Sequence, residues 1–480
     1  MKKLVHDILN RVARRGVEFG DVRYTSSDSE SFYFQRGNLI NYGSDMNNSS
    51  IGIRVLVNGC WGFAGINDFN NGAIEKAIDL AITNAKAGSR FRKNPVKIGT
   101  QPSTVASYRQ TVAEDPFLMP REEKMEYLKN LAASLNGNEK IVFNYLITEF
   151  YRQYKIYANT EGTFTDTLKY NVMPYFSVLA SDGEQVMSRT YPGHMTAVSG
   201  GFEVIRNSGM VENVEQCIKE AIDLLSAPRI EEERSDIIIG GNHLSLQLHE
   251  SIGHATEADR IFGMEISYAG KTFVKPEMLG KFQYGSEIVN VISDSTDIDG
   301  INYQPVDDDG VPGKKVFIIK NGILMDQQSS RETAMQLGTE PSSNMLATDG
   351  YNFPLIRMSN LNLLPGTAGT LKDLIKNTEK GYLVDFTKTW SIDDNRNNFQ
   401  FTTEIGWKIK DGEIVGIVKE PTYFGLTPEF WNSCDAICSE SEWKYHGTFN
   451  CGKGEPGQAM HLSHKTAPAR FKNVVVNVKA

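Results

Sequence analysis

Two histidines five positions apart, with a glutamate beside the first, are the feature that most constrains how this chain can fold. They are His249, Glu250 and His254, in the stretch LHESIGHATEAD. At about 100° per residue, helical side chains four apart lie roughly 40° from each other around the axis, and side chains five apart roughly 140°. A regular helix therefore cannot direct both imidazoles at one ion. The spacing predicts either a π-type turn or a helix that ends near Gly253 so that His254 turns back.

The residue types in this stretch predict a hydrolytic metal site. Imidazole is a good ligand for zinc, and a glutamate beside a bound metal can act as the general base for the metal's water. Catalytic zinc usually has three protein ligands, so a third donor must come from elsewhere in the chain. The residues alone leave this donor open among Cys451, the pair Cys434 and Cys438, His446, and His461 with His464.

Each candidate also has a plainer interpretation. The two histidines could share a surface helix by chance, and Cys451 could be a small residue in the glycine-rich turn FNCGKGEPGQ. Cys434 and Cys438 could be ordinary core residues. The acidic run Asp307-Asp308-Asp309-Gly310 lacks the alternating ligands and distal glutamate of a calcium loop, which favours a turn between strands.

Composition excludes several classes of protein. The chain has 480 residues, of which 40% are hydrophobic, enough for two or three domains with buried cores. Its 59 acidic and 50 basic residues give a net charge of −9, which argues against binding to nucleic acid or anionic membranes. Five scattered cysteines argue against a disulfide scaffold, and no stretch has the apolar run of a signal peptide or membrane span. We expect a soluble, cytoplasmic protein.

The order of predicted elements indicates an α+β fold in two parts. We expect an N-terminal mixed strand and helix domain at residues 1–230 and a β-rich C-terminal domain at residues 231–480, which carries the metal-binding helix. The charged run at residues 227–234 is the expected boundary. Amphipathic helices are predicted at residues 72–87, 121–135 and 215–225, and residues 93–120 are expected to be a surface connection. Asn242 is a candidate N-cap for the helix that carries His249.

Four short motifs in the second half occur in the order seen in one protein family. They are HESIGH at 249–254, DDDGVPG at 307–313, PLIRMSN at 354–360 and CGKG at 451–454. In these segments the chain resembles the TldD/PmbA family of bacterial and archaeal metalloproteases, whose TldD-type members carry H-E-x-x-x-H and a C-terminal cysteine. The N-terminal third resembles the family only in its layout of strands and helices.

The resemblance implies a complete site and an assembly. It implies one Zn²⁺ per chain bound by His249, His254 and Cys451, with Glu250 as the general base. It also implies a homodimer, or a heterodimer with a PmbA-type subunit, around a cavity that admits unfolded polypeptides or peptides. The expected function is zinc-dependent hydrolysis of peptide bonds. The alternatives are a non-catalytic, zinc-stabilised peptide-binding subunit and a metal-dependent amidase acting on small molecules.

Overall fold

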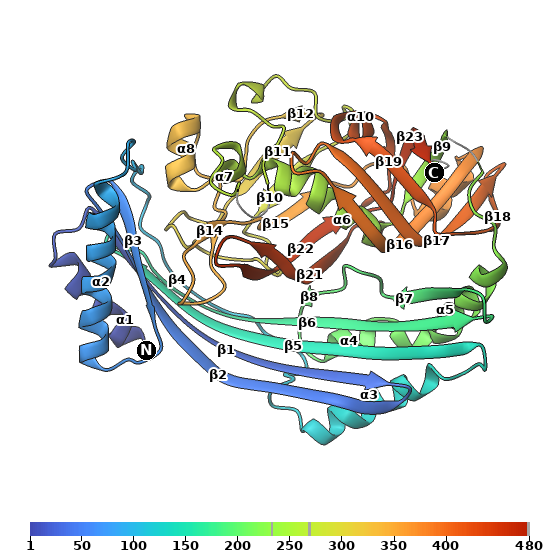
Figure 1. Cartoon of the computed structure of the whole chain (residues 1–480), viewed down its shortest axis with the longest axis horizontal. Helices are drawn as coiled ribbons and strands as arrows, with labels where there is room; N and C mark the ends of the chain where they lie inside the picture. The colour runs from blue at the N-terminus through green and yellow to red at the C-terminus, as the bar shows by residue number, and fades with distance from the viewer. Residues whose placement is uncertain (232–233, 267–269, 478–480) are drawn as a thin grey trace.

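A long curved sheet forms the N-terminal half of the fold, and the β-rich C-terminal half lies against its concave side (Figure 1). The computed structural model describes residues 1–231, 234–266 and 270–477. Within these ranges no helix is long and apolar enough to cross a membrane. The α+β class predicted from the sequence is confirmed.

The N-terminal sheet has eight strands. Its main order is β3-β2-β1-β5-β6-β4, and β7 and β8 also pair with β6. The strands are β1 (Phe19–Gln35), β2 (Asn38–Val57), β3 (Cys60–Ile66), β4 (Val105–Arg109), β5 (Ile141–Asn159), β6 (Phe164–Ser181), β7 (Val186–Tyr191) and β8 (Val198–Ser199). Five helices cover its convex face: α1 (Lys2–Ala13), α2 (Asn71–Ser89), α3 (Arg121–Ser134), α4 (Glu203–Asn207) and α5 (Met210–Ser226).

The central strands of this sheet are longer than the sequence pattern predicts. The polar run at residues 26–31 suggests a break, yet β1 continues through it because β1 pairs with β2 on one side and β5 on the other. In the same way, the strand-like runs at 163–170 and 173–179 form the single strand β6. The connection at 93–120 contains one further strand, the exposed β4, which pairs in parallel with β6.

The C-terminal half contains two larger sheets and two hairpin-like pairs. The seven-stranded sheet comprises β9 (Arg234–Ile239), β16 (Lys380–Ile392), β17 (Asn398–Lys410), β18 (Glu413–Lys419), β19 (Thr422–Leu426), β20 (Cys434–Ile437) and β23 (Ala469–Val476). The four-stranded sheet comprises β10 (Val291–Asp294), β11 (Lys315–Lys320), β12 (Ile323–Leu324) and β15 (Asn360–Leu363). The pairs are β13 (Met345–Leu346) with β14 (Leu355–Ile356), and β21 (Lys444–Lys453) with β22 (Gln458–Thr466).

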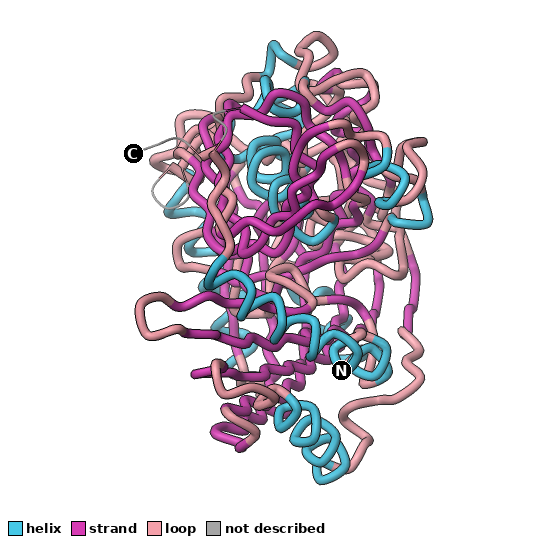
Figure 2. The backbone as a smooth tube through the Cα atoms, turned by 90° about the vertical axis from the view of Figure 1, so that its right-hand side faces the viewer, coloured by secondary structure: helices cyan, strands magenta, loops and turns pink. Residues whose placement is uncertain are grey.

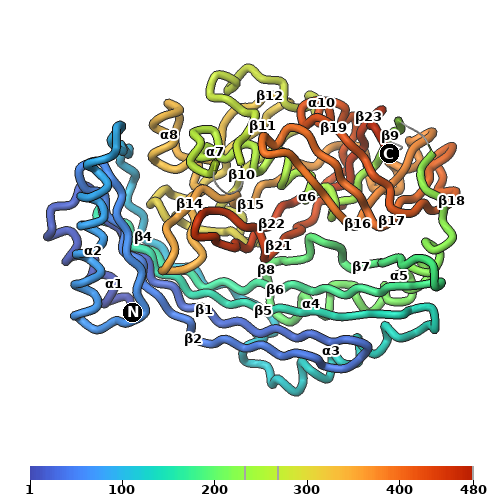
Figure 3. The backbone as a smooth tube through the Cα atoms, viewed as in Figure 1, coloured from blue at the N-terminus to red at the C-terminus, as the bar shows by residue number. Residues whose placement is uncertain are grey.

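Helix α6 (Gly241–Leu248) lies in the middle of this half and positions the candidate site. It contacts β16 on one side and the β21–β22 hairpin on the other, and strands surround it in Figure 2. Its residues 242–248 are all buried because it packs on every side. The other short helices are α7 (Ala258–Ile261), α8 (Arg331–Leu337), α9 (Leu371–Lys376) and α10 (Thr427–Asn432), and Figure 3 shows α8 and α10 at the edge of this half.

The predicted N-cap of α6 is wrong. Gly240 is the N-cap, and the side chain of Asn242 instead accepts hydrogen bonds from the backbone N–H groups of His194 (3.1 Å) and Met195 (3.3 Å). The carboxylate that receives a helix N–H comes from a distant strand: Asp385 Oδ1 accepts from the N–H of His243 at 3.0 Å. A local capping rule could not detect a partner 142 positions away.

Candidate metal centre

The helix distortion that the histidine spacing demands is present. After α6 ends at Leu248, residues His249–Gly253 form a π-helical turn, in which the N–H of His254 bonds to the carbonyl of His249. A 3₁₀ turn, His254–Thr256, follows. Gly253 has an ordinary helical φ of −55°, so its backbone freedom is not what the turn needs. A Cβ at Gly253 would overlap the sulfur of buried Met358, so glycine is required here for close packing.

The turn brings the two histidines and Cys451 together. The Sγ of Cys451 lies 3.3 Å from Nε2 of His249 and 3.6 Å from Nε2 of His254, and all three residues are buried. Ligand atoms around a tetrahedral zinc, with Zn–N and Zn–S distances near 2.0–2.3 Å, lie roughly 3.3–3.6 Å apart. The two sulfur–nitrogen distances therefore match the spacing that zinc requires.

His249 is oriented by another buried histidine. Its Nδ1 lies 2.8 Å from Nε2 of His464, whose Nδ1 lies 3.0 Å from the carbonyl oxygen of Leu361. A carbonyl only accepts, so His464 donates from Nδ1, and its Nε2 then accepts the Nδ1–H of His249. This chain of hydrogen bonds leaves the Nε2 lone pair of His249 directed toward Cys451.

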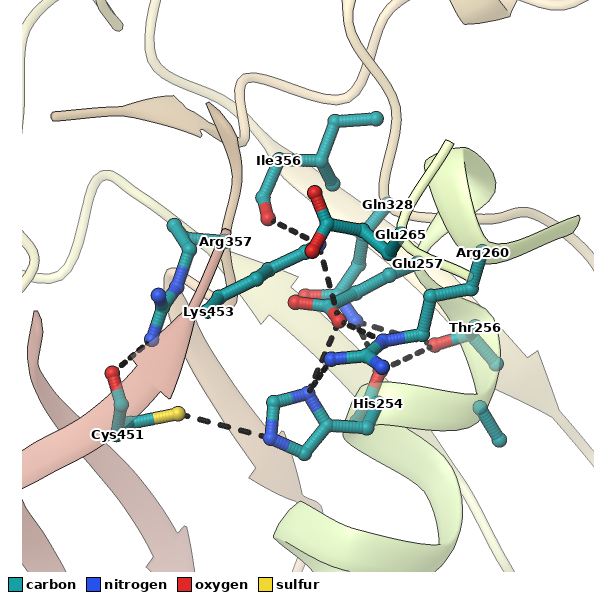
Figure 4. A network of polar contacts seen from close by, with 12 residues as sticks. His254, Thr256, Glu257, Arg260, Glu265, Gln328, Ile356, Arg357, Cys451 and Lys453 are labelled. Carbon is teal, nitrogen blue, oxygen red and sulfur yellow. Dashed lines mark hydrogen bonds and ion pairs between the residues drawn. The ribbon is translucent and has the colours of Figure 1, made fainter. Parts of the chain in front are cut away.

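Glu257 orients the second histidine in the same way. Its Oε2 lies 2.9 Å from Nδ1 of His254 and is also held by Arg260 (2.7 Å) and Lys453 (3.1 Å), as Figure 4 shows. Burial acts to raise the pKa of Glu257, but Lys453, His254 and Arg260 outweigh it and hold the pKa well below its ordinary value. A carboxylate that accepts the Nδ1–H leaves Nε2 of His254 free to bind a metal.

The protonation of the three donors suits a metal. Burial lowers the pKa of His249 and of His254 to about 4, so both imidazoles are neutral at pH 7. Burial acts to raise the pKa of Cys451, but the opposite effect of Arg357 and His254 is larger. The pKa of Cys451 therefore lies below the ordinary thiol value. Arg357 also donates to the carbonyl of Cys451 (Figure 4). Neutral imidazoles and a thiolate are the forms that bind zinc.

Glu250 is held by two residues that no sequence motif indicates. Trp390 Nε1 donates to Oε1 at 3.1 Å, and Arg396 Nη1 donates to Oε2 at 2.7 Å. Trp390 lies on β16 and Arg396 in the turn that leads to β17. The positions of Trp390 and Arg396 in the sequence follow no motif, because their contact with Glu250 depends on how the β16–β17 hairpin folds over the helix.

The four residues open onto a cleft between the two halves of the fold. Its volume is about 910 Å³. His249, Glu250, His254 and Cys451 lie on one wall. The opposite wall is the concave face of the long sheet, where Tyr145, Ile147, Met173 and Tyr175 line the cleft. A peptide-sized ligand could therefore reach the metal donors.

The remaining donor candidates lie elsewhere. Cys434 and Cys438 are buried in the C-terminal hydrophobic core, and burial raises the pKa of Cys438 to about 12. His446 Nδ1 faces the amide of Asn242, and His461 stacks on Phe449 with 3.7 Å between ring centroids. Of the candidates that the sequence left open, the structure places Cys451 beside the histidine pair and gives His464 the supporting role described above.

Three family models cover most of the chain. The PmbA/TldA metallopeptidase domain 1 matches residues 20–85, the central domain residues 114–227, and the C-terminal domain residues 232–476. The chain belongs to the PmbA/TldD family. The resemblance seen in the sequence motifs is therefore confirmed, whereas the division at residue 230 into two domains stays a prediction.

Relatives of this PmbA/TldD protein cover most of its length. A metalloprotease from Methanothermobacter thermautotrophicus is 29% identical, covering 96% of this chain and 95% of its own. A zinc metalloprotease TldD homolog from Saccharolobus solfataricus is 26% identical, covering 90% and 91%. Among solved structures, a putative modulator of a DNA gyrase from Thermotoga maritima matches with a TM-score of 0.76 at 18% identity, covering 99% of both chains. TldE from Thermococcus kodakarensis matches with a TM-score of 0.72 at 15% identity, covering 99% of this chain and 100% of its own. At these identities the two structures support the shared fold alone.

Proposed function

We propose that this PmbA/TldD protein is a zinc-dependent peptidase that hydrolyses peptide bonds of unfolded or small polypeptides. The observation that carries the proposal is the convergence of His249, His254 and Cys451 at zinc-ligand spacing, beside Glu250 on the wall of an open cleft. The names of the relatives, metalloprotease and zinc metalloprotease, support the same class of enzyme.

The donor set fits zinc. Two neutral imidazoles and one thiolate would give the loaded site a formal charge near +1, and they leave room for a fourth ligand. When bound, zinc would polarise the scissile carbonyl and the attacking water. A thiolate ligand makes the metal a weaker Lewis acid than three histidines would, so the reaction should depend more strongly on a protein base.

Glu250 is the proposed base. Its carboxylate would accept a proton from the attacking water and pass that proton to the nitrogen of the leaving amine. Arg396 and Trp390 each hold one of its oxygens, which fixes the plane of the carboxylate. Each carboxylate oxygen has a second lone pair, so one donor per oxygen leaves a position that can accept the proton.

The test is cleavage of an unfolded protein, with fragment masses read out. Activity should be abolished by a chelator and restored by Zn²⁺. Glu250→Gln should retain zinc and lose nearly all turnover, because the amide keeps a similar shape but cannot accept the proton. Full activity in that variant would exclude the proposed base.

Cys451 is tested separately by metal content. Cys451→Ser should lower zinc occupancy, because a neutral hydroxyl is a far poorer zinc ligand than a thiolate. Occupancy equal to that of the unchanged protein would remove Cys451 from the ligand set. Cys434→Ser is the matched control, because this buried cysteine lies in the core away from the site.

One observation favours a second candidate function. Both oxygens of Glu250 are engaged by side chains of the β16–β17 hairpin, as expected if the site only stabilises a peptide-binding subunit. Zinc that is bound without any cleavage would favour that function. Cleavage of very short amides but not of unfolded proteins would instead indicate an amidase for small molecules.

We also propose that the working unit is a dimer, either of two copies or with a PmbA-type chain. The cleft lies between the two halves of the fold, and a second subunit would restrict which substrates enter it. Sedimentation of the protein alone and mixed with a PmbA-type subunit would distinguish the two assemblies. A single monomeric species under both conditions would contradict the proposal.

A further inference from the structure

A second, smaller cavity lies between the long sheet and the C-terminal half. Its volume is about 210 Å³, and none of its lining residues lines the metal cleft. One wall is formed by β5 and β6, with Lys155, Lys169 and Asn171, and another by β22, with Met460 and His461. Met460 is the register partner of Cys451 on the neighbouring strand, so the cavity borders the hairpin that carries the candidate third ligand.

Lys169 brings a positive charge to this cavity without a matching carboxylate. Its Nζ donates to the carbonyl oxygens of Ile301 (3.1 Å) and Tyr303 (3.3 Å), which uses two of its three N–H groups. In the described part of the chain, residues 1–231, 234–266 and 270–477, no carboxylate forms an ion pair with it. A largely buried ammonium without an ion partner is costly, and an anionic ligand would remove that cost.

The neighbouring charges do not compensate Lys169. Asp308 is a buried acid that acts on Lys169 electrostatically, but its Oδ1 binds Lys155 at 2.5 Å, and its Oδ2 accepts the N–H of Ala347 at 2.8 Å and faces Arg23 at 4.0 Å. Asp349 also lines the cavity, yet its Oδ1 accepts from two groups of its own turn. Burial, with a contribution from Lys155, lowers the pKa of Lys169 to about 7. Lys169 is therefore only partly charged when the cavity is empty, and a bound anion would favour its protonated form.

Asn171 supplies the complementary feature. It is 5% exposed and lines the same cavity two positions after Lys169, so both side chains project from one face of β6. Its Nδ2 lies 3.4 Å from Nδ1 of His461, whereas its Oδ1 is buried and has no hydrogen-bond partner. A buried carbonyl oxygen without a donor favours a ligand that carries an N–H group.

We propose that this cavity binds a small carboxylate that bears a neighbouring N–H group, with Lys169 contacting the carboxylate and Asn171 accepting from the N–H. A free amino acid and the carboxyl-terminal residue of a peptide both have this chemistry. The cavity volume of about 210 Å³ is small, which suits a ligand of one residue. The proposal does not depend on peptidase activity, because it concerns binding without turnover.

Calorimetric titration of the zinc-loaded protein with four probes tests the ligand class. Glycine represents a free amino acid, and N-acetylglycine represents a peptide carboxyl terminus. Acetate lacks the N–H group, and N-acetylglycinamide lacks the carboxylate. We expect glycine or N-acetylglycine to bind at least tenfold more tightly than acetate, and the amide not to bind. If glycine binds more tightly, the ligand is a free amino acid, and if N-acetylglycine binds more tightly, it is the carboxyl terminus of a peptide. Equal binding of acetate would overturn the role of Asn171, and binding of none of the carboxylates would overturn the site.

Variants and chemical labelling locate the binding. Lys169→Met should weaken binding at least tenfold, whereas Lys140→Met, at the exposed start of the β5 region, should leave it unchanged. This comparison also separates binding in the cavity from carboxylate binding at zinc, which Lys169→Met leaves intact.

In the unchanged protein, the bound probe should protect Lys169 but not Lys140 from acylation, measured by mass spectrometry. This second measurement holds even if the variant fails to fold. Unprotected Lys169, or binding kept within twofold in a folded Lys169→Met protein, would overturn the proposal.

Discussion

The orientation of a single imidazole controls whether a metal can bind at the candidate site. His464 accepts the Nδ1–H of His249 and so leaves its Nε2 lone pair available. We expect His464→Ala to lower zinc affinity by roughly 10- to 100-fold, the usual cost of removing a residue that orients a metal ligand. Competition with a chromophoric chelator measures this affinity.

His446 offers a matched control for that measurement. It is the register partner of His464 on β21, but its ring faces Asn242 instead of a metal donor. His446→Ala should therefore leave zinc affinity unchanged. Equal losses in the two variants would mean that the β21–β22 hairpin, and not the hydrogen bond to His249, sets the affinity.

Arg396 is a positioning residue, because it acts through Glu250. Its removal in Arg396→Ala frees one carboxylate oxygen and should lower kcat by roughly 10- to 100-fold, as expected when a reacting group loses its alignment. KM and zinc content should change little, and Arg396→Lys should restore part of kcat. A rise in kcat would show instead that Arg396 competes with the substrate water for Glu250.

At the scale of elements, the π turn depends on how closely it packs. Gly253→Ala should lower the free energy of unfolding by about 1–3 kcal/mol, because the added Cβ would overlap the sulfur of the fully buried Met358. Urea denaturation measures the change. Gly416→Ala on exposed β18 is the control, since a Cβ there has no neighbour within 4 Å. A loss no greater than in that control would show that Met358 can move aside.

Short hairpins are the elements that local sequence defines best. The pairs Asn58-Gly59, Asn321-Gly322 and Asp411-Gly412 all have positive φ at both positions and connect antiparallel strands. Such two-residue turns need the left-handed region, which Asn, Asp and Gly tolerate. A local signal is sufficient for these hairpins, because their conformational requirement is met within two residues.

At the scale of the whole molecule, buried charges join the two halves of the fold. Arg54 on β2 binds Asp21 on β1 (2.6 Å) and Asp309 of the acidic turn (2.9 Å), and Lys155 on β5 binds Asp308. The first aspartate, Asp307, accepts backbone N–H groups that shape the turn itself. The acidic run is thus the turn that the sequence favoured over a calcium loop, and it docks the C-terminal half onto the sheet.

Buried histidines should make stability depend on pH. Burial lowers the pKa of His243 to about 3, against an ordinary value of about 6.5 in the unfolded chain. Between these values the unfolded chain binds the extra proton, so the stability contributed by neutral His243 is lost as pH falls below about 6.5. The loss is on the order of a few kcal/mol once pH approaches the folded pKa.

A comparison of variants isolates this contribution from other titrating groups. Burial raises the pKa of the neighbouring Asp385 to about 6, which acts in the opposite direction, so the slope of the unchanged protein alone is not decisive. The cost of His243→Gln in urea denaturation should be largest near pH 7 and shrink toward pH 5. His6→Gln, at an exposed position of α1, is the control variant. A cost for His243→Gln that is constant with pH would contradict the assignment.

The sequence by itself determined the family of this protein and the need for a distorted helix, and the tertiary structure decided the geometry of the candidate site. The five-residue spacing of His249 and His254 required a distorted helix, because helix geometry is local, and the ordered motifs identified the family. Which cysteine joins the histidines, and which residues hold Glu250, could not be read from spacing. Cys451 is 197 positions from His254 and Arg396 is 146 from Glu250. Such contacts arise only when sheets and hairpins pack around α6, since that packing brings together residues whose separation along the chain carries no signal.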